Sequence, residues 1–300
     1  MQIVLRQALV IIVALVFLGF SPLARADLLH SSNAKGFFDQ GVEYAESGQY
    51  EEAKLAFTQA IQTETKVALA YTNRCWVNLQ LANPQQAVQD CAEALRLQPD
   101  NPEAYLNRGV AQFRLGHYEA AIADQTHLIE LAINDLRAYF NRGLALSMVG
   151  QWQQAISDYD QALQRVVDNN NEIRSDIYTE RGLAQASLGN WAQAKGDYAQ
   201  AIALNPHSDR AYYNRGCLHL QRGNYPLAIE DLNHALALSP NNPDAYLDRG
   251  LAYYQLGDNP EAIRDLHQAA QTFLNQGEQI AYHRILTLIQ QIQFEASVIG

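Results

Sequence analysis

The side chains that could carry covalent or metal chemistry are few and scattered along this sequence of 300 residues. Three cysteines, Cys75, Cys91 and Cys217, could form a disulfide or remain thiols, and eight histidines could bind a metal. No histidine belongs to an HExxH motif or to the Cys/His spacing of a zinc site, and the sequence has no phosphate loop, nucleophile elbow or kinase signature. The sequence therefore indicates a protein that is not an enzyme and uses no metal or cofactor.

The composition narrows the class of partner. The chain carries 21 Lys and Arg against 32 Asp and Glu, a formal net charge of −11. This surplus repels phosphate groups, and no run of Lys or Arg offsets it, so nucleic-acid binding is excluded. Nothing in the sequence points to a small-molecule substrate. A hydrophobic content of 48% is enough to form a sizeable core.

The first 26 residues differ from everything that follows. Arg6 precedes the apolar run 8–20, and Ala24-Arg25-Ala26 fits the small-x-small pattern of a signal-peptidase site. The apolar run has 13 residues, whereas a membrane span needs roughly 20. We therefore predict a signal peptide at residues 1–26 and a short leader at 27–33.

The predicted signal peptide implies a location outside the cytoplasm. Export to a bacterial periplasm, or to a lumen, is the main expectation. The alternative is an uncleaved membrane anchor formed by residues 3–20. Contact with a membrane is expected only in that second case.

Beyond this segment, one local context recurs at an almost constant interval. A small residue occupies the same surroundings seven times, a glycine six times and Cys75 once, at spacings of 34 residues except for one step of 39. Stretches such as AYLNRGVAQFRLGHYEAAI and AYFNRGLALSMVGQWQQAI are closely similar. The pattern resembles the tetratricopeptide repeat family, whose unit of about 34 residues is a helical hairpin.

The resemblance implies an all-α fold, a right-handed superhelical solenoid of helix-turn-helix units. Five extra residues, 170–174, follow the fourth unit, and three consecutive asparagines at 169–171 predict a loop there. An apolar stripe of helical spacing in residues 277–300 predicts a capping helix over the last repeat or, alternatively, a docking helix for a partner. The seven units are placed at residues 34–67, 68–101, 102–135, 136–169, 175–208, 209–242 and 243–276.

Six of the seven units share an arginine and an aspartate that depart from the family pattern. They stand at the seventh and twenty-third positions, and the first unit lacks both, with Gln40 and Ala56 instead. This joint gain and loss predicts an Arg–Asp contact between the two helices of each hairpin; the alternative is a row of arginines that binds anions. The pairs are Arg74–Asp90, Arg108–Asp124, Arg142–Asp158, Arg181–Asp197, Arg215–Asp231 and Arg249–Asp265.

The resemblance also brings two cysteines together. Cys75 and Cys91 occupy positions eight and twenty-four of the second unit, which face each other across the hairpin. An exported chain would permit their oxidation, so a Cys75–Cys91 disulfide is one interpretation. The other is a pair of small buried thiols, and Cys217 remains free in both.

The family resemblance implies that the first helix of each unit lines a concave groove. Asparagine recurs at the sixth position, and its amide can both donate to and accept from a peptide backbone. Large aromatic residues beside this row are the expected anchors. The predicted partner-binding residues are Asn73, Trp76, Asn107, Phe113, Arg137, Phe140, Asn141, Arg210, Tyr213 and Asn214.

These features predict a scaffold or adaptor that binds an extended segment of a protein or peptide partner. A chaperone-tail clamp is not expected, because its Lys and Asn positions hold Phe38 and Val42 in the first unit and no other window supplies the set. The alternative is a membrane-anchored assembly factor that uses the convex face.

Overall fold

The computed structural model describes residues 36–64, 66–131, 134–167 and 170–299. The predicted signal peptide, the leader at 27–33 and the alternative anchor at 3–20 lie outside these residues. None of the helices in the described part is both long and apolar enough to cross a membrane.

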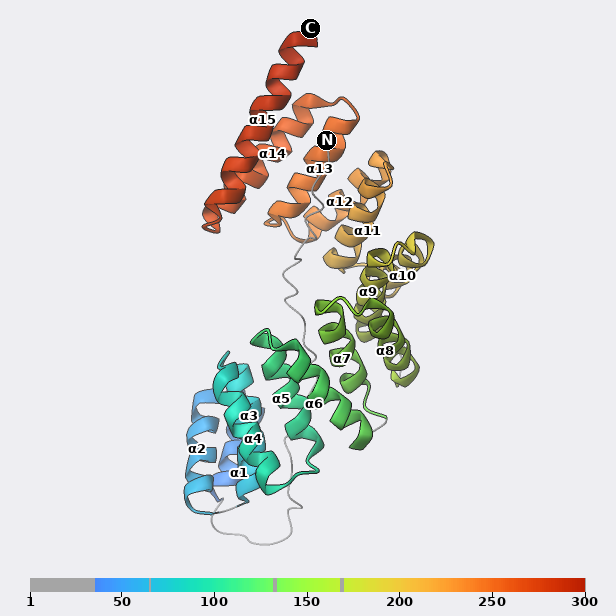
Figure 1. Ribbon diagram of the computed structural model, residues 1–300. Helices are drawn as coiled ribbons and strands as arrows, with labels where there is room; N and C mark the ends of the chain where they lie inside the picture. The colour runs from blue at the N-terminus through green and yellow to red at the C-terminus, as the bar shows by residue number, and fades with distance from the viewer. Residues whose placement is uncertain (1–35, 65, 132–133, 168–169, 300) are drawn as a thin grey trace. The chain divides into compact units, whose positions relative to one another are not determined.

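The described part of the chain forms fifteen α-helices and no β-strand, which confirms the predicted all-α class (Figure 1). Fourteen of the helices pair into seven hairpins. We call the odd-numbered members α1 to α13 the first helices and the even-numbered members α2 to α14 the second helices. The bounds are α1 (Phe37–Glu46), α2 (Tyr50–Gln62), α3 (Val67–Gln80), α4 (Pro84–Leu97), α5 (Pro102–Arg114), α6 (Tyr118–Leu131), α7 (Leu136–Met148), α8 (Trp152–Arg165), α9 (Asn171–Ser187), α10 (Trp191–Leu204), α11 (Asp209–Gln221), α12 (Tyr225–Leu238), α13 (Pro243–Gln255), α14 (Asn259–Asn275) and α15 (Gln279–Ile299).

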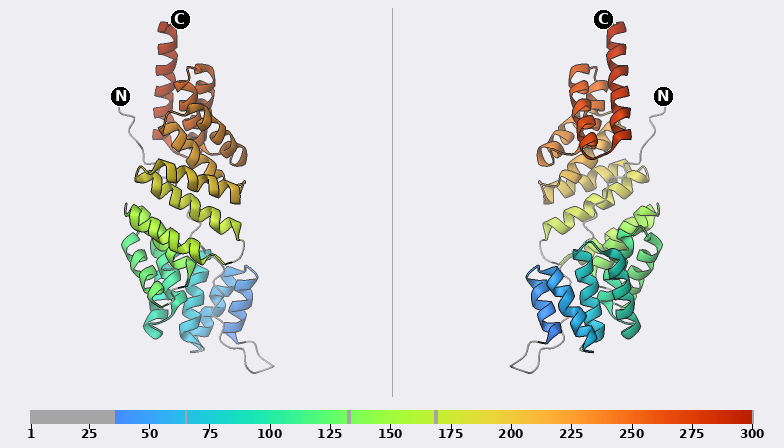
Figure 2. Two further views of the ribbon diagram at one scale, coloured as in Figure 1. Left: turned by 90° about the vertical axis from the view of Figure 1, so that its right-hand side faces the viewer. Right: turned by 90° about the vertical axis from the view of Figure 1, so that its left-hand side faces the viewer.

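The chain divides into two compact units, an N-terminal unit that ends at Arg165 and a C-terminal unit that begins at Val166. In each unit, every helix packs on the next along the chain, so that successive hairpins stack (Figure 2). Consecutive first helices also contact one another, as α3 contacts α5 and α9 contacts α11, whereas contacts between second helices of the described chain are at most marginal. The first helices therefore form the inner, concave layer of each unit.

Close approach of the two helices in a hairpin depends on the recurring glycine. A Cβ atom added at Gly143 would lie 2.7 Å from the ring of Tyr159, and one added at Gly182 would lie 2.7 Å from the ring of Tyr198. Both rings are fully buried, and the Tyr159 hydroxyl is hydrogen-bonded to Ser147 at 3.1 Å. The rings therefore have little room to move aside.

This packing gives a first testable prediction. The variant Gly143→Ala is expected to lower the free energy of unfolding by roughly 1–3 kcal/mol, because the added methyl group overpacks the hairpin. Gly196→Ala is the matched control, since Gly196 lies in α10 with no atom near an added Cβ. The control should stabilise the protein by about 0.5–1 kcal/mol through helix propensity alone. Urea denaturation measures both, and equal effects would contradict the packing argument.

The predicted loop at 170–174 is wrong for most of its length. Helix α9 already begins at Asn171, and the side chain of Asn170 accepts a hydrogen bond from the backbone N–H of Ile173 at 3.1 Å. Asparagine favours this N-cap position as strongly as it favours loops. The inserted residues therefore lengthen α9 to 17 residues, against 13 in α11.

The last helix, α15, packs along α14. Ile285, Ile289 and Ile292 are buried in a cluster with Phe273 and other apolar residues of α14. These isoleucines recur at helical spacing, so one stripe of α15 covers the apolar face of the final hairpin. Other apolar side chains on this helix remain exposed, among them Ile280 at 71% and Phe294 at 69%.

Candidate functional site

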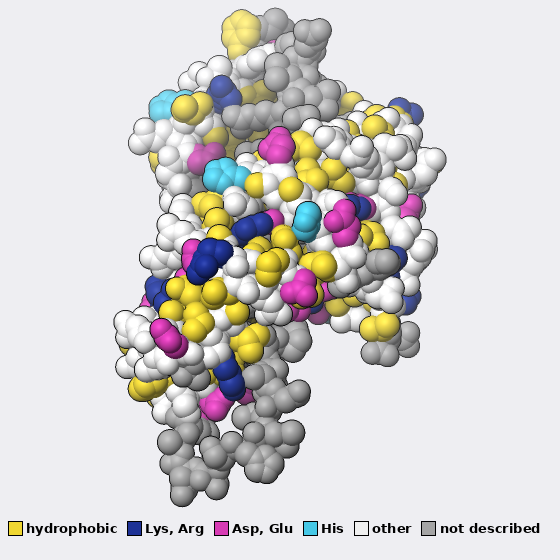
Figure 3. All heavy atoms as spheres, turned by 60° about the horizontal axis from the view of Figure 1, so that its bottom comes forward, with side chains coloured by type: hydrophobic (Ala, Val, Ile, Leu, Met, Phe, Trp, Pro, Cys, Tyr) yellow, Lys and Arg dark blue, Asp and Glu magenta, His cyan; other side chains and the backbone are white. Residues whose placement is uncertain are grey.

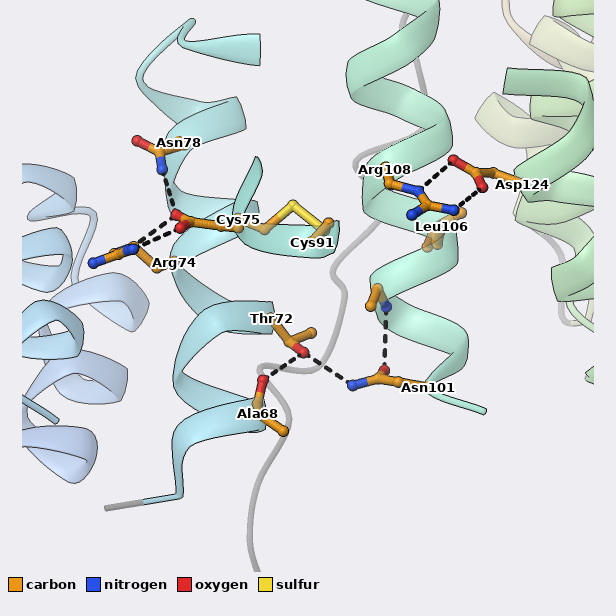
Figure 4. The surroundings of a disulfide bond; sticks show 12 residues. Ala68, Thr72, Arg74, Cys75, Asn78, Cys91, Asn101, Leu106, Arg108 and Asp124 are labelled. Atoms are coloured by element: carbon orange, nitrogen blue, oxygen red, sulfur yellow. Dashed lines mark hydrogen bonds and ion pairs between the residues drawn. A yellow bond between two sulfur atoms is a disulfide. The ribbon is translucent and has the colours of Figure 1, made fainter. Parts of the chain in front are cut away.

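The six Arg–Asp pairs are bidentate ion pairs between the two helices of a hairpin. In the second hairpin, Arg74 Nε donates to Asp90 Oδ2 at 2.9 Å and Nη2 donates to Oδ1 at 2.6 Å, and Arg108 and Asp124 repeat these distances (Figure 4). The same two bonds join the other four pairs. All six aspartates are buried. The arginines are thus used within the fold, which opposes the alternative of an anion-binding row.

A disulfide joins α3 to α4. The Cα atoms of Cys75 and Cys91 are 5.4 Å apart, both side chains are fully buried, and their sulfurs are bonded (Figure 4). Asn78 donates to Asp90 at 2.9 Å close to this bond, which adds a further link between the helices. Cys217 is a free thiol.

The predicted asparagine row lies on the first helices but is deeply set. Asn73, Asn107, Asn141 and Asn214 retain only 2%, 2%, 5% and 7% of their exposure. Both amide atoms of Asn141 are buried without a hydrogen-bond partner in the described structure. A buried amide in this state costs about 1–3 kcal/mol relative to a satisfied one. Asn141 is therefore the member of this row that has both amide atoms buried and unpartnered among the described residues.

Two of the four predicted aromatic anchors are not exposed. Phe140 retains 2% and Tyr213 7% of their exposure, so neither ring presents a free face in this structure. Phe140 packs against the ring of Tyr159 across the hairpin, and the Tyr213 hydroxyl donates to Asp248 at 3.0 Å. Position in the repeat did not separate a side chain that faces the groove from one that packs between hairpins.

The other two aromatic residues are half-buried. Trp76 meets the ring of Tyr50 at 5.8 Å, and its indole N–H is buried without a partner in the described residues. Phe113 meets the ring of Tyr118 at 5.4 Å. Trp76 and Phe113 therefore remain candidate contacts for a partner.

Arg137 and Arg210, the two arginines among the predicted partner-binding residues, are both ion-paired. Arg137 binds Glu103 on the neighbouring first helix at 2.9 Å and Asp135 at 2.6 Å. Burial alone would lower the pKa of Arg137, but hydrogen bonds with these two carboxylates outweigh it and raise the pKa. Arg210 pairs with Glu180 of α9, and this attraction raises its pKa. Both arginines join adjacent first helices.

Surface charge of both signs is interspersed among hydrophobic side chains. The face presented in Figure 3 shows blue, magenta and yellow groups next to one another, without an extended basic patch. The described residues also hold no group of three His, Cys, Asp or Glu side chains placed to bind a metal ion.

Sequence reasoning missed two acidic pairs in the C-terminal unit, one on α9 and one on α13. Asp176 and Glu180 lie on α9, and Asp244 and Asp248 lie on α13. Burial raises the pKa of Asp176 to about 6 and that of Asp248 to about 6. The signal was present in the sequence, because the second and sixth positions of the fifth and seventh units are all acidic.

Comparison with protein families identifies the repeat directly. Models described as TPR repeat or tetratricopeptide repeat match several segments that together cover more than half of the chain. The chain therefore belongs to the tetratricopeptide repeat family. The matched residues are 34–65, 85–116, 102–134, 178–208, 198–230, 218–257 and 244–273.

Solved structures share the fold at low sequence identity. A tetratricopeptide repeat protein from Parabacteroides merdae has a TM-score of 0.64 and 18% identity, with 86% of this chain and 97% of that chain covered. The pilF protein of Pseudomonas aeruginosa has a TM-score of 0.61 and 18% identity, with coverages of 73% and 96%. Human sperm-associated antigen 1 is 40% identical over 63 residues, which is 21% of this chain and 7% of that protein. These likenesses establish the fold.

Proposed function

We propose that this protein is a non-catalytic scaffold that holds an extended segment of a protein partner against its first helices. Tetratricopeptide solenoids provide concave surfaces for protein–protein interaction. The observation that carries the finer proposal is the buried amide of Asn141, which lacks a partner on both its oxygen and its nitrogen. A peptide backbone offers the N–H and C=O groups that such an amide needs.

Neighbouring residues support this mode of binding. The side chain of Asn107 stands on the adjacent first helix, α5, and makes no hydrogen bond to the described residues. Successive amides on parallel first helices can grip the backbone of an extended chain without reading its sequence. Half-buried Trp76 and Phe113 offer apolar contact in the same unit.

We also propose that the protein works outside the cytoplasm. The signal-like sequence at 1–26 supports this location. A disulfide between Cys75 and Cys91 fits an oxidising compartment, because cytosolic disulfides are rare.

The binding proposal is tested by crosslinked affinity capture from the native host. We expect a partner captured by the wild type to be lost from the variant Asn107→Ala/Asn141→Ala. The matched control is Gln85→Ala/Gln89→Ala, which removes two exposed amides from the second helix α4. Far-UV circular dichroism verifies that both variants remain folded. A partner retained by the groove variant, or lost equally from both, would contradict binding at the first helices.

A further inference from the structure

The first helices of the C-terminal unit carry a negatively charged surface on their inner side. It consists of Asp176 and Glu180 on α9, Arg210 and Asn214 on α11, and Asp248 on α13. Arg210 is its one cation, and its guanidinium pairs with Glu180. After that pairing, Asp176 and Asp248 still lack a basic partner at ion-pair distance among the described residues.

The helices bring these carboxylates to the two sides of Asn214. Arg210, Asn214 and Cys217 share one face of α11, since they are spaced by four and three residues. Arg210 reaches Glu180 of α9, and the Cys217 thiol donates to Asp248 of α13 at 3.3 Å. Asn214 therefore lies between the acidic residues of both neighbouring helices.

Asn214 provides an observation independent of the charges. Its side chain retains only 7% of its exposure and makes no hydrogen bond to any described residue. Its amide oxygen can accept from a cationic donor, and its NH2 can donate to a peptide carbonyl. An unsatisfied amide flanked by uncompensated carboxylates is an arrangement that a ligand carrying both a positive charge and a backbone would complete.

We infer that this surface receives basic side chains of the extended partner segment, one lysine or arginine at Asp176 and another at Asp248, with Asn214 holding the backbone between them. The inference rests on the proposed function and adds the charge of the partner. Charge complementarity selects this occupant, since acidic side chains or anions would be repelled.

The protonation of the two aspartates supports the assignment. Burial is the main cause that raises the pKa of Asp176 to about 6; Glu180 and Glu172 raise it further and Arg210 lowers it. Burial likewise raises the pKa of Asp248 to about 6, with Asp244 raising it and hydrogen bonds from Cys217 and Tyr213 lowering it. A bound cation would favour the charged forms of both carboxyls.

The test uses the full chain and a fluorescein-labelled peptide with lysine at every third position in a Gly/Ser background. Fluorescence anisotropy at pH 7.5 should show saturable binding, while the same peptide with glutamate in place of lysine should not bind. The variant Asp176→Asn/Asp248→Asn keeps the side-chain shapes and should weaken binding by roughly tenfold or more. Binding to the wild type should also weaken about tenfold between pH 7.5 and pH 5, as both aspartates take up protons.

A control variant distinguishes the loss of the Asp176 and Asp248 carboxylates from a general change in the net charge of the protein. Glu230→Gln/Glu278→Gln removes two exposed negative charges from the same unit, one on α12 and one just before α15, and should change the affinity less than twofold. The inference is overturned if the lysine peptide does not bind, if both double variants weaken it equally, or if spermine displaces it at equal concentration of positive charge. Loss of the native partner from Asn107→Ala/Asn141→Ala tests the proposed function separately, so the two can fail independently.

Discussion

Replacing Arg142 by alanine should lower the free energy of unfolding by roughly 2–4 kcal/mol, because it leaves a buried carboxylate without its partner. Asp158 retains 4% of its exposure and accepts two hydrogen bonds from Arg142, both at 2.7 Å. Arg142 also donates to Thr126 of the preceding hairpin at 3.1 Å, so its loss weakens the contact between hairpins as well. Urea denaturation followed by circular dichroism measures the effect.

A double-mutant cycle isolates the ion pair from the other losses. The variant Arg142→Ala/Asp158→Ala should be destabilised by less than the sum of the two single variants, since it leaves neither charge unpaired. Arg264→Ala breaks an exposed pair with Glu261 and should cost less than about 1 kcal/mol. Strictly additive single effects would show that Arg142 and Asp158 do not stabilise each other.

The sequence predicts the hairpins well because the repeat constrains them many times over. A glycine that lies close against the second helix, an alanine on that facing helix and an Arg–Asp pair each recur in phase, so the two helices of a hairpin follow from pattern alone. The first hairpin lacks both members of the Arg–Asp pair and has Gln40 and Ala56 in their places, so the two residues are lost together. The physical reason is that these residues act within one hairpin, at a fixed sequence separation.

The candidate site was harder to predict because it depends on contacts between hairpins. A first helix has one face toward the groove and others toward neighbouring helices, and contacts with Tyr159 and Asp248 bury Phe140 and Tyr213. Asn170 likewise serves as a helix cap where a loop was expected. The burial of the two rings is decided by neighbouring side chains, whereas the Asn170 cap is a local choice between two conformations that asparagine favours equally.

The first helices of the two units differ in the charged and unsatisfied side chains that they carry. In the N-terminal unit, Arg137 is balanced by Glu103 and Asp135, and the unsatisfied groups include the neutral amide of Asn141 and the indole N–H of Trp76. On the inner surface of the C-terminal unit, the carboxylates of Asp176, Glu180 and Asp248 outnumber the guanidinium of Arg210.

Removing the disulfide is the other change with a large expected effect. Cys75 and Cys91 are separated by 16 residues, and closing a loop of this size stabilises a fold by about 3 kcal/mol. The variant Cys75→Ala/Cys91→Ala should therefore unfold at a lower urea concentration than the oxidised wild type. Adding dithiothreitol should bring the wild type close to the variant and leave the variant unchanged.

Cys217→Ala is the control for effects of losing a thiol, because Cys217 forms no disulfide. This control should retain the full response to dithiothreitol. A wild type that is equally stable with and without reductant would mean that the Cys75–Cys91 bond contributes nothing to the stability of the fold. Because the bond lies within a single hairpin, its loss should weaken α3 and α4 first and, through their contacts with α2 and α5, the rest of the N-terminal unit. Reduction of the disulfide would thus lower the stability of the first helices that carry Asn107 and Asn141.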